Sequence, residues 1–276
     1  MTSLAGLERL PREPHTGRVT QARVALSEWT KLRSLRSTRW SLLAAIVLTI
    51  GFPLLFAAIT SSHWGSMSPH EHADRHPLDI ALAGVNVSQL AIAVLGALVI
   101  TGEYSTGMIR ASFSAVPKRL PVLWAKTGVF ALVTFLLMLP SVVIAFFGSQ
   151  AILSRHHILQ ISFLHPGVAR SVIGGAVYVV LVGIFALGIG ALIRNTAGGI
   201  ATFAGIFFVI PPLMNILPSS WNDAISPYLP GSAGSQILSR SHGSNNLGPW
   251  TGFAVFCAWA AGALAIAAVL LLRRDT

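Results

Sequence analysis

The sequence is poor in charged residues and in cysteine. Charged side chains make up 10% of its 276 residues, and only nine of them are acidic, whereas soluble domains carry roughly a quarter charged residues. With 53% hydrophobic residues, the chain is therefore predicted to be a membrane protein. Its single cysteine, Cys257, excludes an internal disulfide and is expected to be a small buried residue.

Motifs for catalysis are also missing. The sequence has no G-x-x-x-x-G-K-[ST], so the chain is not expected to hold a nucleotide in a P-loop of its own. It shows no pairing of a nucleophile with a base, and no charged pair deep in an apolar run that would form a proton relay. We therefore expect a non-catalytic protein.

Long stretches without charge divide the sequence into six apolar runs. Each has a core of about 20 residues, the length that a helix needs to cross roughly 30 Å of hydrocarbon. The predicted fold is all-α, a polytopic membrane protein with six transmembrane helices. The spans are expected at about 40–59, 80–100, 127–151, 171–193, 196–216 and 250–272.

The distribution of Lys and Arg predicts the orientation. With six spans both termini lie on the same side, and that side receives 15 of the 19 basic residues. Cytoplasmic loops carry the excess of Lys and Arg, so both termini are predicted to be cytoplasmic. The net charge of +10 and the pI near 11.2 are therefore mostly a topology signal. No nucleic-acid partner is expected, because no recognisable nucleic-acid-binding module is present.

The residues before the first span form two predicted parts. Residues 1–23 mix Pro, Gly and charge without periodicity and are predicted to be a mobile cytoplasmic tail. Residues 24–39 are predicted to be an amphipathic helix in the lipid headgroup layer, the alternative being a plain positively charged flank. Its apolar residues recur every three positions among basic ones, and the key side chains are Trp29, Lys31, Leu32, Arg33 and Arg36.

Two connections on the predicted outer side carry distinctive residues. The loop 63–76 contains "HEHADRH", which is not the H-E-x-x-H of zinc proteases. Its weak candidate metal ligands are His70, His72 and His76. They leave an alternative function open, in which the protein is a membrane-anchored sensor or metal-binding protein that acts through this loop. In residues 218–249 and just beyond, Trp221, Tyr228 and Trp250 lie among Pro and Gly, which favours a segment at the outer membrane interface.

The connection after the second span contains an acidic residue that topology does not explain. Glu103 follows the span directly, and Arg110 lies two helical turns later on the same face. A carboxylate there is expected to pair with Arg110, with the basic juxtamembrane helix, or with a docked partner. Lys126 is expected to anchor the start of the third span. Reversing Glu103 to Lys is predicted to leave membrane insertion intact.

Four segments together resemble a known family. "EYSTGMIRASFSAVPKRLPVLWAK" resembles the E-Y-x-x-G-T-[IL]-R-x-x-L-x-x-x-P-x-R…K stretch of ABC transporter permeases of the type-2 exporter class, particularly those of high-GC Gram-positive bacteria, the actinobacteria. "SEWTKLRSLRSTRWSLLA", "LGIGALIRNTAGGIA" and "YLPGSAG" are similar to other segments of that family, in the same order. The sequence departs at Met108, where Thr is usual, and at Phe113, where Leu is usual.

The resemblance implies a permease domain over residues 40–276, in a bacterial plasma membrane. Two such subunits, a homodimer in the simplest case, would enclose a pathway for efflux, in contact with membrane lipid. A separate ATPase subunit would bind ATP and Mg²⁺, and this chain would bind no cofactor. The resemblance assigns coupling to that ATPase to Glu103, Tyr104, Gly107, Arg110, Lys118 and Arg119.

Overall fold

The computed structural model describes residues 20–105, 119–155, 160–240 and 246–273. Within these ranges the chain forms helices and no strands, which confirms the all-α prediction. The predicted tail up to residue 19 lies outside the described residues, as do Gly107, Arg110 and Lys118. Arg119 opens a helix, but its side chain is not among those described.

Six helical segments of the described chain are long and apolar enough to cross a membrane, which confirms the predicted six spans. They begin and end a few residues beyond most of the predicted apolar cores, because a helix continues through the headgroup region on either side. The chain is therefore a multi-pass membrane protein. The spans are α2 (Arg36–His63), α4 (Pro77–Ser105), α6 (Arg119–Arg155), α7 (Val168–Ile193), the segment Thr196–Met214, and α12 (Pro249–Arg273).

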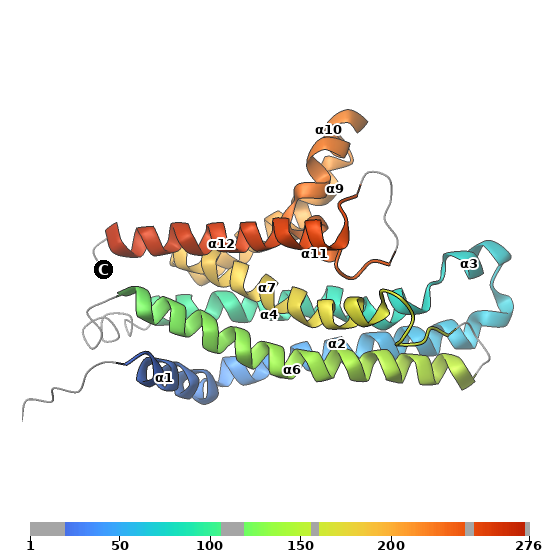
Figure 1. Cartoon of the computed structure of the whole chain (residues 1–276), viewed down its shortest axis with the longest axis horizontal. Coiled ribbons are helices and arrows are strands. Elements are labelled where there is room, and N and C mark those ends of the chain that lie inside the picture. The colour runs from blue at the N-terminus through green and yellow to red at the C-terminus, as the bar shows by residue number, and fades with distance from the viewer. Residues whose placement is uncertain (1–19, 106–118, 156–159, 241–245, 274–276) are drawn as a thin grey trace, which may run out of the picture.

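The fifth span is not one regular helix. It consists of α8 (Thr196–Ala204), a π-helical turn η2 (Gly205–Val209) and α9 (Ile210–Met214). Prolines at the start of α9 lack the N–H that a regular α-helix needs, and a π turn precedes them. In Figure 1 this part of the chain leaves the bundle, and α10 (Ser219–Ile225) lies farther out still.

Short helices connect the spans at the far end of the bundle, which we define as the end where α7 and α12 begin. The turn after α2 contains η1 (Trp64–Ser66) and α3 (Pro69–Asp74), on the right in Figure 1. Between α10 and α12 lie η3 (Ser226–Tyr228) and α11 (Pro230–Ser235). The two ends of the described chain both lie at the opposite end of the bundle, on the left in Figure 1. This arrangement agrees with an even number of spans.

The N-terminal amphipathic helix differs from the prediction in two ways. The structure ends α1 (Gln21–Ser34) before Leu35, whose backbone is extended, and Arg36 already belongs to α2. The buried face of α1 recurs every four residues, at Val24, Glu28 and Leu32, instead of every three. A spacing of four keeps side chains on one face of a helix, whereas strict spacing of three drifts around it. Trp29 is therefore 45% exposed and not part of the packed face.

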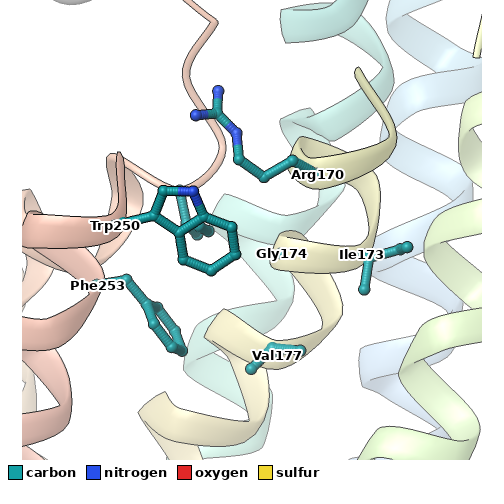
Figure 2. Close-up of a pocket in the computed structure, with 7 residues that line it drawn as sticks. Arg170, Ile173, Gly174, Val177, Trp250 and Phe253 are labelled. Carbon is teal, nitrogen blue, oxygen red and sulfur yellow. The ribbon is translucent and has the colours of Figure 1, made fainter. Parts of the chain in front are cut away.

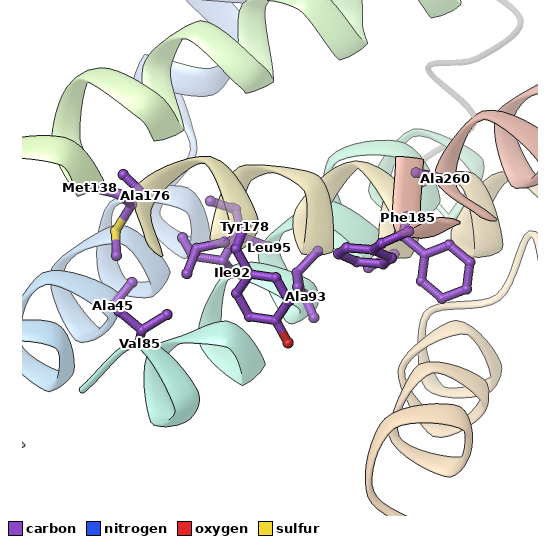
Figure 3. Packing of buried hydrophobic residues seen from close by; sticks show 14 of the residues in the cluster. Ala45, Val85, Ile92, Ala93, Leu95, Met138, Ala176, Tyr178, Phe185 and Ala260 are labelled. Carbon is purple, nitrogen blue, oxygen red and sulfur yellow. The ribbon is translucent and has the colours of Figure 1, made fainter. Parts of the chain in front are cut away.

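Helix α7 is at the centre of the bundle and packs against α4, α6 and α12. Figure 3 shows side chains of α7, including Tyr178 and Phe185, among those of neighbouring helices. The Tyr178 hydroxyl donates a buried hydrogen bond of 2.6 Å to Oε1 of Gln89 in α4. The two helices cross most closely at glycines, since a Cβ at Gly96 would lie 2.2 Å from the carbonyl oxygen of Gly183. Glycine at position 96 lets the two backbones touch, while a Cβ at Gly183 would meet the Phe130 ring of α6 at 2.5 Å.

Candidate functional site: a buried charge cluster

Four charged side chains meet where α1, α4 and α6 come together. Glu28 and Lys31 come from α1, Glu103 from the last turn of α4, and Lys126 from the N-terminal part of α6. Lys31 Nζ donates to Glu28 Oε1 at 2.7 Å and to Glu103 Oε1 at 2.8 Å. Lys126 Nζ donates to Glu103 Oε1 at 2.9 Å and also to Glu28 Oε2. We call these four residues the charge cluster, and the end of the bundle that holds them the cluster end.

The cluster is neutral and almost entirely buried. Two carboxylates face two ammonium groups, and the side chains of Glu28 and Lys126 are each 3% exposed. Glu103 is 8% exposed, and Lys31, at 26%, is the member that reaches the surface. A charge taken out of water is tolerated only when it is paired and hydrogen-bonded. Each buried charge is therefore compensated by the opposite charges in the cluster, and the ion pairs hold α1 against α4 and α6.

The environment of Lys31 favours its charged form. Partial burial works against the ammonium, but hydrogen bonds and attraction from Glu103 and Glu28 outweigh it and raise the pKa of Lys31 above its usual value. Lys31 therefore stays charged over the physiological pH range. The ion pairs of Lys31 with Glu28 and Glu103 are therefore not lost through deprotonation of Lys31 near neutral pH.

The end of α4 also contacts the turn between α7 and α8. The hydroxyl of Thr196 in α8 donates to that of Thr101 in α4 at 2.8 Å. The guanidinium carbon of Arg194 lies 5.2 Å from the centre of the Tyr104 ring, within the range of a cation–π interaction. Arg194 has a positive φ of 59° and ends α7, while the side chain of Asn195 caps α8 by accepting from the N–H of Gly198.

The last turn of α4 is therefore a junction of four helical elements. Glu103 connects it to α1 and α6, while Thr101 and Tyr104 connect it to the α7–α8 turn. The connection 106–118 follows this turn directly in the sequence. A displacement of the end of α4 must consequently move α1 and the start of α6, or break buried ion pairs.

The sequence predicted part of this site. Of the three partners proposed for Glu103, the structure places the juxtamembrane helix against it, through Lys31. Lys126 was expected only to anchor its span, yet it is a buried member of the cluster. Glu28 was missed, although a single acid in an otherwise basic segment was a usable signal. Arg33 and Arg36 are exposed and take no part in the cluster.

The candidate metal ligands of the loop 63–76 do not gather into a site among the described residues. Within those residues no group of three or more His, Cys, Asp or Glu side chains is placed to hold a metal ion. His72 instead stacks on the ring of Trp64 at 4.2 Å, and its Nε2 lies 2.8 Å from the Trp64 carbonyl oxygen. His70 and His76 are exposed. These contacts with Trp64 give His72 a structural role in the turn that joins α2 to α3.

No model of a protein family matches the chain, and no curated protein matches it.

Proposed function

We propose that this chain is the membrane subunit of an ATP-driven exporter of the ABC type-2 class, with ATP hydrolysis carried out by a separate protein. The observation that supports this most strongly is the charge cluster, which joins α1, α4 and α6 immediately before the connection 106–118. The E-Y-x-x-G motif by which the sequence resembles such permeases begins with Glu103 and Tyr104 in the last turn of α4 and continues into that connection. A rigid junction at the end of a loop is what a partner needs in order to move several spans together.

In this proposal the cluster end faces the cytoplasm. The predicted inner side has 15 of the 19 basic residues, and those of them that the structure describes belong to segments at the cluster end, in agreement with the positive-inside rule. The partner would bind ATP and Mg²⁺ and contact the connection 106–118. On ATP binding it would displace that connection, and the ion pairs of Glu103 would pass the displacement to α1 and to α6. Trp29, exposed on α1, would lie in the lipid headgroup layer.

A second copy of the chain would complete the transport pathway in the bacterial plasma membrane. The fifth span offers a surface for such contact, since Phe208, Val209 and Leu213 are between 43% and 55% exposed. In a dimer that encloses a pathway, part of this apolar surface would contact the second subunit and the rest would face lipid. The exported substrate is not specified by any of these features.

ATP hydrolysis by the purified chain provides the test. The chain purified alone is expected to hydrolyse no ATP, because its sequence has no P-loop. The chain isolated from its native membrane is expected to co-purify with a P-loop ATPase and to show vanadate-sensitive hydrolysis. A variant ATPase lacking its P-loop lysine is the matched control for contamination. Hydrolysis by the chain alone that persists at constant specific activity through further purification would contradict the proposal.

A further inference from the structure

A groove at the far end of the bundle lies between the first turns of α7 and α12. Its walls are Ile173 and Val177 of α7 and Trp250 and Phe253 of α12, and Figure 2 shows Val177 and Phe253 on facing sides. The volume is about 240 Å³, below the roughly 300–1,000 Å³ of pockets for drug-sized ligands. Ile173 is 46% and Trp250 is 68% exposed, so the groove opens to the outside of the bundle.

The groove has a charged rim and an apolar interior. Arg170, in the first turn of α7, lies at the rim, and the rest of the lining is apolar or aromatic. Since a helix rises 1.5 Å per residue, Val177 is about 10 Å deeper along α7 than Arg170. Trp250 is the second residue of α12, a position typical of the membrane interface. The groove therefore runs from the headgroup level into the hydrocarbon.

Arg170 has donors to spare. Toward the described residues its guanidinium makes one hydrogen bond, from Nη2 to the carbonyl oxygen of Ser239 at 2.6 Å. Its Nε atom is buried and has no hydrogen-bond partner in the described part of the chain. A guanidinium carries five N–H donors, and phosphate is a preferred acceptor for them. One bond to the described residues holds the side chain in place, and because Nε is buried, a phosphate can be bound only through the terminal nitrogens Nη1 and Nη2.

We propose that this groove binds an anionic phospholipid, with its phosphate on Arg170 and one acyl chain between α7 and α12. The positive charge of Arg170 favours an anionic headgroup, and the depth and apolar lining of the groove favour an acyl chain. The groove is open to the outside of the bundle, so it can hold part of an extended acyl chain, whereas a soluble anion would leave its apolar part uncovered. The bound lipid would bridge the central helix α7 to the last span. The proposal depends on the six spans alone and does not require the proposed exporter function.

Lipid binding by the full-length chain tests the proposal. In native mass spectrometry we expect the detergent-solubilised protein to retain phosphatidylglycerol in preference to phosphatidylcholine with the same acyl chains. Arg170→Gln is expected to lower the affinity for phosphatidylglycerol about fivefold, the effect of one cation near an anionic lipid, without affecting phosphatidylcholine. Val177→Trp fills the interior and is expected to lower both affinities. Arg155→Gln removes an exposed cation at the same end of the bundle and is the matched control.

A second readout covers the case in which Val177→Trp fails to fold. A photoreactive benzoylphenylalanine in place of the exposed Ile173 is expected to cross-link to phosphatidylglycerol in mixed vesicles, and Arg170→Gln is expected to reduce the yield. The proposal is overturned if Arg170→Gln binds phosphatidylglycerol as Arg155→Gln does. Cross-linking to a second copy of the chain instead of to lipid would likewise overturn it, because the groove would then be a protein interface.

Discussion

Replacement of Lys126 by Met is expected to destabilise the protein by about 3–5 kcal/mol, the cost of breaking a buried ion pair by removing one partner. Lys126 is 3% exposed and contacts both carboxylates of the cluster. Without it, Glu28 and Glu103 retain only Lys31 between them, and the cluster has an uncompensated negative charge. The affected contacts hold α1 against α6, so α1 should separate from the bundle before the spans unfold.

The expected loss can be measured by unfolding in mixed micelles of detergent and SDS, together with limited proteolysis of α1. Arg33→Met is the matched control, because Arg33 is an exposed cation of α1 outside the cluster and should change stability by less than about 0.5 kcal/mol. Adding Glu28→Gln to Lys126→Met restores neutrality and leaves the Lys31–Glu103 pair, so the double variant should recover part of the loss. A Lys126→Met protein as stable as the Arg33→Met protein would show that the cluster contributes little.

Replacement of Gly96 by Leu is expected to be at least as disruptive, with a loss of more than about 3 kcal/mol and poor accumulation in the membrane. A Cβ at this position would lie 2.2 Å from the Gly183 carbonyl oxygen and 3.0 Å from its carbonyl carbon. These are backbone atoms, which no change of rotamer can move aside. The helices α4 and α7 must separate, and the Tyr178–Gln89 hydrogen bond that joins the same two helices is then lost.

Gly128→Leu is the control for this substitution. Gly128 is an exposed glycine of α6, and a Cβ there would meet no atom within 4 Å. The same change of residue should therefore be tolerated, with a small gain from the better helix propensity of leucine. Both variants can be compared by their amount in purified membranes and by their unfolding midpoints. Equal stability of the Gly96→Leu and Gly128→Leu proteins would rule out the close approach of α4 and α7.

The spans were predictable from the sequence because a bilayer imposes one length on every crossing helix. Charged residues bound each apolar run, and for all six runs the helix covers most or all of the predicted core. The lengths of the apolar runs and the positions of the charged residues are enough to predict where the six spans lie.

Contacts between helices were not predictable in the same way. Glu28 lies 75 positions before Glu103 in the sequence, and nothing local to either residue shows that α1 folds back against α4. The sequence also did not show which side of α1 packs against the bundle: Trp29, predicted to lie in the headgroup layer, is exposed, whereas α1 buries Val24, Glu28 and Leu32. Pairs such as Gly96 and Gly183 become visible only when the helices are packed, since the chain has 25 glycines.

The structure also changes how the role of Glu103 should be tested. From the sequence, Glu103→Lys was expected to leave membrane insertion intact, because Glu103 was placed at a membrane boundary. Since Glu103 lies between Lys31 and Lys126, that change would bring three ammonium groups together in a buried site and release α1. Glu103→Gln keeps the shape of the side chain and removes one charge, so it is the better probe of coupling.

The most direct test of the proposed function is to map where a co-expressed ATPase touches the chain. A photo-cross-linker at the exposed Ser105, the last residue of α4 at the cluster end, is compared with one at Trp221, 61% exposed in α10. The proposal predicts ATPase cross-links from position 105, none from position 221, and a lower yield from position 105 in the Glu103→Gln background. Cross-links from position 221 alone, or equal yields from both positions, would contradict it.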